Sequence, residues 1–197
     1  MVFLPTGSGA GFFESCDNPT VNILFIHQNF PGQFRYLAPA LAERGHQVLA
    51  IGSKGNIGAL PGVELCHYEL DRGNTPGIHP LASEWETKVL RGEACAQVAE
   101  QLRRRGFVPD LIIAHPGWGE ALYLQDVFPD SPMLCFTEFF YRSAGPEVGF
   151  DPEFPNSSLH DMARIHTKNA NLLLALERMD VGISPTRWQA SLHPQWA

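Results

Sequence analysis

The apolar positions of this chain follow two alternating spacings from residue 22 onward. Short continuous runs rich in β-branched and aromatic residues are typical of strands buried on both faces, whereas apolar residues three or four positions apart indicate amphipathic helices. The pattern predicts strands over residues 23–26, 46–52, 63–68, 110–114, 133–137 and 181–184. It predicts helices over residues 34–42, 81–105 and 120–127, and one further helix that includes residues 162–176.

This alternation predicts an α/β fold, a doubly wound parallel sheet of the Rossmann-like class. We expect seven strands or nearly so, with the first and fourth strands adjacent. In the long helix, the residues expected to face inward are Trp85, Val89, Gly92, Ala96, Ala99 and Leu102. The chain shows no internal repeat, so residues 22–197 are predicted to form one domain. Residues 1–21 are interpreted as a partly disordered leader or linker, including their glycine-rich segment at 7–11.

The composition indicates a globular domain and argues against nucleic-acid-binding, membrane-spanning and secreted proteins. Hydrophobic residues make up 44% of the 197 residues and charged residues 18%, which is typical of a globular domain. The formal net charge of −7 argues against a nucleic-acid partner, because proteins that bind nucleic acid usually present a basic surface. The sequence contains neither an apolar stretch long enough to span a bilayer nor a secretory signal, so we expect a cytoplasmic protein.

The predicted topology indicates where a ligand would bind. In a doubly wound sheet, ligands bind beyond the carboxyl ends of the strands, where the strand order reverses. Two loops meet there, residues 27–33 after the first strand and residues 115–120 after the fourth. Gly32 would let backbone N–H groups approach an anion at a helix N-terminus. The spacing is not G-x-G-x-x-G, which disfavours a dinucleotide oxidoreductase, and no H-x₃-H or H-E-x-x-H spacing indicates a metal site.

Four segments resemble the N-terminal domain of family 4 retaining glycosyltransferases, and in particular a bacterial group of that family. They are NILFIHQNFPGQFRYLAPALAERG at 22–45, HPGWGE at 115–120, FDPEFP at 150–155 and DVGISPTRWQ at 180–189. The resemblance implies a GT-B architecture, in which two Rossmann-like halves face a cleft, usually without a catalytic metal. It further implies that this chain is the acceptor-side half and that the donor-binding half is absent.

The resemblance also implies roles for individual residues. His115 matches the active-site histidine of the family, and Gly32 with Gln33 matches the loop beside the donor diphosphate. The loops around this crevice suggest acceptor-binding roles for a further group of residues, namely His27, Asn29, Trp118, Glu138 and Arg142. For Glu138 and Arg142, a salt bridge that holds the following loop is the alternative interpretation. For His115, the alternative is a structural role in capping the turn before Pro116.

The leading hypothesis is therefore the acceptor-side half of a retaining glycosyltransferase. It would transfer a sugar from a nucleotide diphosphate sugar to a hydroxyl group of a glycan, a lipid-linked acceptor or a small molecule, with no cofactor and no metal. A non-catalytic Rossmann-like module that binds a nucleotide or a protein is the second hypothesis, and an epimerase on the same two-domain plan is the third. A homodimer, and peripheral membrane contact by a full-length protein, are compatible with the first.

Overall fold

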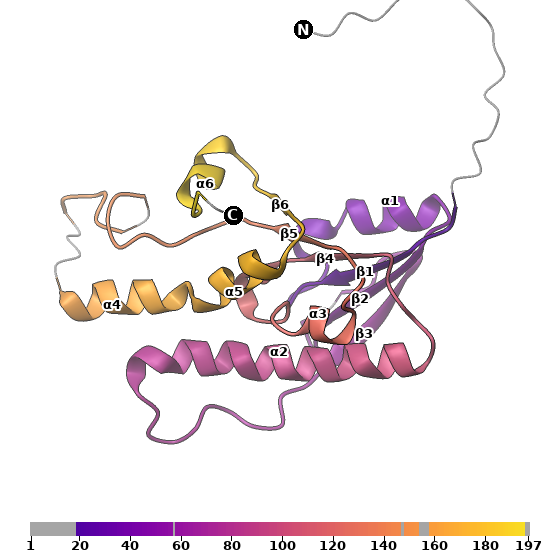
Figure 1. Ribbon diagram of the computed structural model, residues 1–197, viewed down its shortest axis with the longest axis horizontal. Helices are drawn as coiled ribbons and strands as arrows, with labels where there is room; N and C mark the ends of the chain where they lie inside the picture. Colours follow the sequence, from indigo (N-terminus) through magenta and orange to yellow (C-terminus); the bar gives the residue numbers. More distant parts are fainter. Residues whose placement is uncertain (1–18, 57, 147, 154–157, 196–197) are drawn as a thin grey trace, which may run out of the picture.

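The fold is a single parallel sheet with helices on both faces (Figure 1). The computed structural model describes residues 19–56, 58–146, 148–153 and 158–195. Its strands are β1 (Asn22–Ile26), β2 (Gln47–Ser53), β3 (Val63–Tyr68), β4 (Leu111–Ala114), β5 (Met133–Phe136) and β6 (Val181–Ile183). Its helices are α1 (Leu37–Glu43), α2 (Pro80–Arg104), α3 (Leu124–Val127), α4 (Leu159–Lys168), α5 (Ala170–Arg178) and α6 (Arg187–Leu192), with short 3-10 helices η1 (Gly32–Phe34) and η2 (Pro116–Trp118).

All pairings in the sheet are parallel, and the strand order is β3-β2-β1-β4-β5-β6. The predicted Rossmann-like class and the predicted neighbourhood of the first and fourth strands are both confirmed. The described residues supply six strands to this sheet, within the expected number. Because the strand order reverses between β1 and β4, the loops that follow these two strands lie next to each other at the carboxyl edge.

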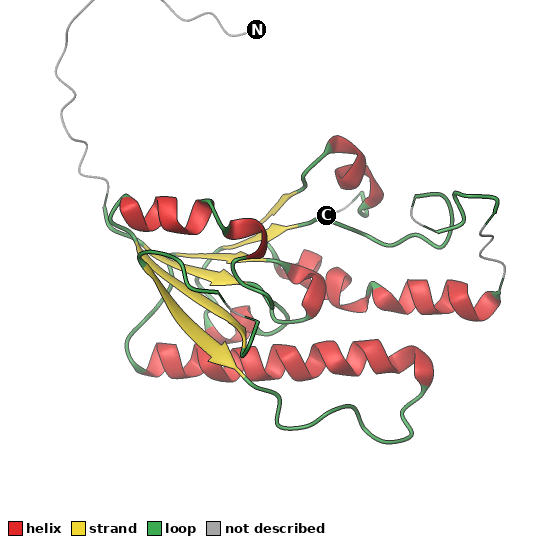
Figure 2. Ribbon diagram, turned by 180° about the vertical axis from the view of Figure 1, so that it is seen from behind, coloured by secondary structure: helices red, strands yellow, loops and turns green. Residues whose placement is uncertain are grey.

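Two apolar layers hold the sheet between its helices. On one face, Phe25 and Ala50 pack with Phe34 and Ala38 under α1; on the other, a larger cluster around Leu24 packs against α2 and α3. Figure 2 shows α1 and the long α2 on opposite sides of the strands. The central strands are buried on both faces, which explains their continuous apolar sequences.

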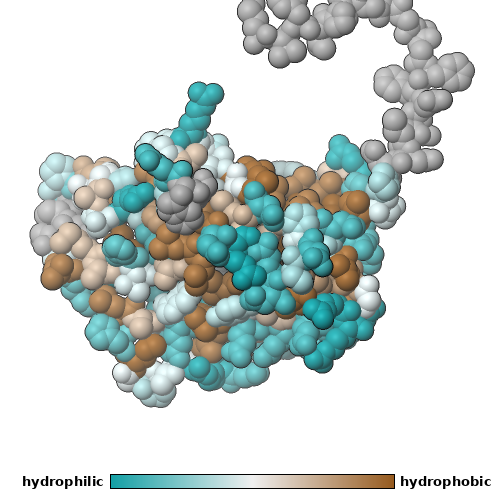
Figure 3. Space-filling view, viewed as in Figure 1, coloured by the Kyte–Doolittle hydropathy of each residue, from teal (hydrophilic) through white to brown (hydrophobic). Residues whose placement is uncertain are grey.

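The edge of the sheet at β6 is less covered. Val181 and Ile183 of this strand are exposed, and so is Trp188 of α6. Apolar side chains also remain visible between polar ones on the face seen in Figure 3. None of the described helices is both long enough and apolar enough to cross a membrane.

The helix α2 begins and ends as its sequence predicts. His79 caps its first turn, since its Nδ1 accepts a hydrogen bond from the N–H of Leu81, and Pro80 occupies the first helical position. At the other end, Arg103 and Arg104 lie in the last turn and Arg105 at the C-cap, where the negative end of the helix dipole favours cations. The predicted inward stripe is partly wrong, because the buried positions are Lys88, Leu90, Gly92, Cys95, Ala99 and Leu102.

The single helix predicted near the C-terminal end is two helices, α4 and α5. They are separated at Asn169, whose side chain pairs with the backbone of Tyr141 on the strand-to-helix connection. The N–H of Tyr141 donates to Oδ1 of Asn169 at 2.9 Å, and Nδ2 of Asn169 donates to the carbonyl of Tyr141 at 2.7 Å. This pairing fixes the connecting chain against the break between the helices.

Other helix boundaries also differ from the prediction. The first predicted helix starts later, because Phe34 belongs to η1, and the third is reduced to the four residues of α3. The predicted leader lies largely outside the described residues, as do the glycine-rich segment at 7–11 and the end of the segment at 150–155.

Candidate active site

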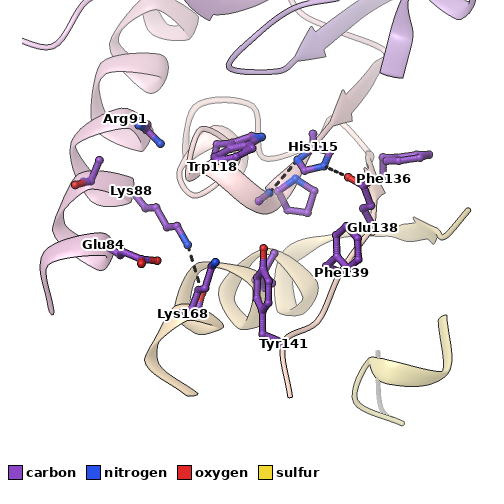
Figure 4. Close-up of a pocket in the computed structure, with 14 residues that line it drawn as sticks. Glu84, Lys88, Arg91, His115, Trp118, Phe136, Glu138, Phe139, Tyr141 and Lys168 are labelled. Carbon is purple, nitrogen blue, oxygen red and sulfur yellow. Dashed lines mark hydrogen bonds and ion pairs between the residues drawn. The ribbon is translucent and has the colours of Figure 1, made fainter. Parts of the chain in front are cut away.

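A pocket of about 520 Å³ opens beyond the carboxyl ends of β4 and β5 (Figure 4). One of its walls is formed by α2, and the opposite wall by η2 and the chain that follows β5. The end of α4 and the start of α5 close it from a third side. Its lining residues are Glu84, Thr87, Lys88, Arg91, His115, Pro116, Gly117, Trp118, Phe136, Glu138, Phe139, Tyr141, Lys168 and Leu172. This volume lies within the usual range for small-molecule sites.

His115 stands at the end of β4 and both caps a turn and lines the pocket. Its Nδ1 accepts a hydrogen bond from the N–H of Gly117 at 3.2 Å, which is the capping role of the alternative interpretation. Because Nδ1 is an acceptor, the proton of the neutral ring is on Nε2, which lies 3.3 Å from Oε2 of Glu138 and donates to it. Burial lowers the pKa of His115, and the hydrogen bond and charge of Glu138 oppose this shift.

A second histidine extends this hydrogen-bonded chain to the loop after β1. Nδ1 of His27 accepts from the N–H of Asn29 at 2.9 Å, so Nε2 carries the proton and donates to Oε1 of Gln33 at 2.7 Å. Nε2 of Gln33 in turn donates to Oε2 of Glu138 at 3.2 Å. The Glu138 carboxylate therefore accepts one hydrogen bond from each of the two loops.

His27 and His115 lie so close together that a positive charge on one ring disfavours protonation of the other. Their ring centroids are 5.2 Å apart, and both side chains are buried. Burial and the neighbouring His115 lower the pKa of His27 to about 4, although Gln33 and Glu138 act in the opposite direction. Both rings are therefore neutral near pH 7, in agreement with the proton positions assigned from their partners.

Gly32 packs directly against the ring of His27. Its φ is +45°, and a Cβ added there would lie 2.5 Å from Nε2 of His27. The backbone of the loop thus packs directly on the imidazole, which only glycine permits.

Most of the predicted site residues lie together. Beyond the chain formed by His27, Gln33, Glu138 and His115, the Trp118 ring stacks on His115 at 6.4 Å between centroids. Asn29 is exposed and outside the lining of the pocket; its contact with His27 is made by its backbone.

Arg142 lies outside this group. Unlike Glu138, it does not line the pocket, and among the described residues Glu138 pairs with His115 and not with Arg142, so the alternative interpretation of a salt bridge between Glu138 and Arg142 is wrong. Its Nε donates to the carbonyl of Leu192 at 3.0 Å, and its guanidinium lies 4.9 Å from the centre of the Phe140 ring. The chain after β5 thus places Arg142 next to α6 and outside the pocket.

Three cationic residues of the pocket were not predicted, namely Lys88 and Arg91 of α2 and Lys168 of α4. Lys88 lies on the buried stripe of α2 among apolar and small residues, although hydrophobic periodicity alone assigns a lysine to the solvent-facing side. Glu120, from the HPGWGE segment, does not line the pocket. It is fully buried and accepts a hydrogen bond from the hydroxyl of Tyr68, and burial raises its pKa. No cluster of three or more His, Cys, Asp or Glu side chains suited to a metal occurs among the residues that the structure describes.

Comparison with known proteins identifies the family. The sequence model of the glycosyl transferase family 4 group matches residues 44–197, more than three quarters of the chain, and the chain therefore belongs to this group. A search of curated proteins gives no match.

The comparison with solved structures gives matches that include two bacterial proteins. One is a protein from Listeria monocytogenes described as a UDP-N-acetylglucosamine 2-epimerase, with 12% identity and a TM-score of 0.45 over 88% of this chain and 41% of that one. The other is the Bordetella bronchiseptica enzyme WbmH in complex with NAD⁺, with 12% identity and a TM-score of 0.43 over 84% and 56% of the two chains. The chain thus spans about half the length of these structures or less.

Proposed function

We propose that this domain is the acceptor-side half of a retaining glycosyltransferase. The enzyme transfers a sugar from a nucleotide diphosphate sugar to a hydroxyl group of an acceptor held in the pocket beside His115. The observation that carries the proposal is the position of this pocket in a family 4 domain: it lies beyond β4 and β5, next to a hydrogen-bonded chain that joins the two loops at the strand-order reversal.

The proposed reaction needs little covalent chemistry from the protein. The bond between the anomeric carbon and the diphosphate oxygen breaks, and the acceptor oxygen bonds to the same face of the sugar. The proton of the acceptor hydroxyl passes to the departing diphosphate oxygen, which leaves with the electrons of the broken bond. Positioning of the two substrates and stabilisation of the developing charges then supply most of the rate enhancement. A neutral His115 suits this role, because a fixed imidazole at the pocket wall can contact the sugar without adding a buried positive charge.

Glu138 and Gln33 act on the position of His115 rather than on the sugar. Glu138 fixes the imidazole through Nε2 and is itself held by Gln33 of the other loop. We assign Gly32 and Gln33 to the edge of the donor diphosphate, since their loop lies beside His115 but does not line the acceptor pocket. A second Rossmann-like domain would bind most of the nucleotide.

The test is an assay of an enzyme that carries this domain together with a donor domain. UDP- and GDP-sugars are incubated with hydroxyl acceptors, and the release of nucleoside diphosphate is measured with and without acceptor. NMR of the product gives its anomeric configuration. Acceptor-dependent release with retained configuration supports the proposal. Inversion of configuration, or conversion of the nucleotide sugar to an isomer with no transfer, would refute it.

A further inference from the structure

Three cationic side chains gather on one side of the pocket. Lys88 and Arg91 project from α2 and Lys168 comes from the end of α4, across the pocket from His115 and Glu138 (Figure 4). The chain as a whole carries a formal net charge of −7, so this local concentration of positive charge does not follow from its composition.

Lys88 is the most buried of the three, with 7% of its surface exposed. Its Nζ donates to Oδ1 of Asn171 at 3.0 Å and to the carbonyl of Lys168 at 3.4 Å, both of which are neutral acceptors. Burial lowers the pKa of Lys88, and the charges of Lys168 and Arg91 add to this effect while Glu84 opposes it. A buried ammonium group without a carboxylate partner is costly, and an anion bound beside it would reduce that cost.

The other two cations are also available to a ligand. Nζ of Lys168 lies 4.2 Å from the centre of the Tyr141 ring, a cation–π contact that places the ammonium group at the wall of the pocket. Among the described residues, neither Lys168 nor Arg91 forms an ion pair with a carboxylate. The acidic residues of the lining have other partners, since Glu138 accepts from His115 and Gln33, and Glu84 lies 4.0 Å from Arg164.

The rest of the lining is suited to a sugar or another flat apolar ring face. Trp118, Phe139 and Tyr141 line the same pocket, and aromatic faces stack well on such surfaces. From these contacts we propose that the pocket binds a phosphorylated acceptor, with the phosphoryl group on Lys88, Arg91 and Lys168 and the hydroxyl-bearing part toward His115. The identification of the phosphorylated ligand as the acceptor rests on the proposed function, whereas the anion site itself does not depend on it.

The experiment measures binding to this chain without any donor. Glucose 6-phosphate, glucose and inorganic phosphate are titrated separately, and NMR follows the indole N–H of Trp118, which lines the pocket. Vesicles of phosphatidylinositol and of phosphatidylcholine form a second arm, which distinguishes a lipid phosphate from a soluble one. We expect a phosphorylated probe, soluble or lipid, to bind at least about ten-fold more tightly than its uncharged or zwitterionic counterpart, because hydrogen bonds between charged partners are stronger than those to neutral groups.

Two variants locate the phosphoryl group. Lys168→Gln and Arg91→Gln should each weaken binding of the phosphorylated probe by about five-fold or more. Arg164→Gln is the matched control, because it removes the same charge from α4 at a residue that does not line the pocket, and binding should change less than two-fold. Lys88→Met tests the buried cation, with the melting temperature measured alongside to detect loss of folding.

Several results would overturn the inference. The first is that glucose binds as tightly as glucose 6-phosphate and phosphatidylinositol vesicles give no response. The second is that the Arg164 and Lys168 variants weaken binding equally. Displacement of the sugar phosphate by UDP would place the donor in this pocket instead. Failure of the transfer assay with the anion site intact would contradict only the proposed function, whereas transfer to neutral acceptors without phosphate binding would contradict only this inference.

Discussion

Glu138 holds His115 from the opposite loop: its Oε2 lies 3.3 Å from Nε2 of the imidazole, and the two residues are 23 positions apart. The same oxygen accepts from Gln33, so one carboxylate ties together the loops that follow β1, β4 and β5. The position of His115 at the pocket wall is therefore set from both of its ring nitrogens, by Glu138 at Nε2 and by Gly117 at Nδ1. This arrangement separates two roles that can be tested by different substitutions.

His115→Asn should preserve the turn and impair the reaction. The side-chain oxygen of asparagine can replace Nδ1 as acceptor for the N–H of Gly117, but no group replaces Nε2. The variant is made in an enzyme that carries this domain together with a donor domain. We expect its melting temperature and its affinity for nucleoside diphosphate to stay close to those of the unsubstituted enzyme, and its kcat to be lower by about 10²–10³-fold. His115→Gln is the converse variant, since it can reach Glu138 but loses the cap. Normal turnover in His115→Asn would leave His115 with the capping role alone.

Glu138→Gln should lower the pKa of His115 further. Burial already lowers this pKa, and the charge of Glu138 opposes the shift by favouring the protonated ring. Removal of the charge leaves burial less strongly opposed, so the pKa of His115 should fall. NMR titration of the imidazole Cε1–H signal measures the change, with Glu84→Gln as the control because Glu84 lines the same pocket without contacting His115. A pKa that stays the same or rises in Glu138→Gln would contradict the assigned hydrogen bond.

The free energy of unfolding should fall in acid because of His27. Its pKa is about 4 in the folded protein and near the ordinary 6.5 when unfolded, so between these values the unfolded state binds more protons. The stabilisation is complete above about pH 6.5 and is lost progressively as the pH falls from there to and through 4, with a size on the order of 3 kcal/mol.

Urea denaturation at pH 7, 5.5 and 4 measures this effect. His27→Asn is the reference, because asparagine does not titrate and can still accept from the N–H of Asn29. The stability difference between the two proteins should shrink as the pH falls. A difference that is constant across this range would show that His27 titrates normally in the folded state.

Nucleoside diphosphate should bind this chain only weakly. In the proposed division of labour a second domain supplies most contacts to the nucleotide, so this domain by itself would leave the diphosphate largely solvated. Calorimetric titration with UDP and GDP is the measurement. Sub-micromolar affinity would contradict the proposed division of labour between the two domains.

The sequence was sufficient to predict the sheet and the centre of the site. Runs such as 23–26 are apolar throughout because β1 is buried on both faces, and parallel strands place their carboxyl ends at one edge. His27 and His115 follow β1 and β4 directly, so their proximity is a consequence of topology, and Gln33 lies in η1 at the end of the loop that begins with His27.

The cationic wall could not be predicted in the same way. The predicted stripe of α2 placed Trp85 and Val89 inward, whereas the observed stripe passes through Lys88, Gly92 and Cys95. Periodicity treats a lysine as a solvent-facing position, and only the packing of Asn171, 83 residues later, makes Lys88 an inward one. The position of Arg142 could not be predicted for a related reason. It depends on how Asn169 holds the backbone of Tyr141 in the chain after β5.

Gly32→Ala should destabilise the domain by two separable effects. The φ of +45° costs a residue with a Cβ about 1 kcal/mol, and the Cβ itself would lie 2.5 Å from Nε2 of His27. Gly45→Ala is the control for the first effect alone, because Gly45 has a φ of +87° and a Cβ there would have no atom within 4 Å. We expect Gly32→Ala to cost about 1–3 kcal/mol more than Gly45→Ala.

A double-mutant cycle isolates the contact with the histidine. In a His27→Ala background the clash is removed and the strain remains, so the cost of Gly32→Ala should fall to that of Gly45→Ala. Urea denaturation of the four proteins gives the coupling free energy, which should exceed about 1 kcal/mol. A coupling near zero would mean that the loop moves freely away from His27, and the chain of hydrogen bonds from His27 to Glu138 would then not be a rigid support for His115.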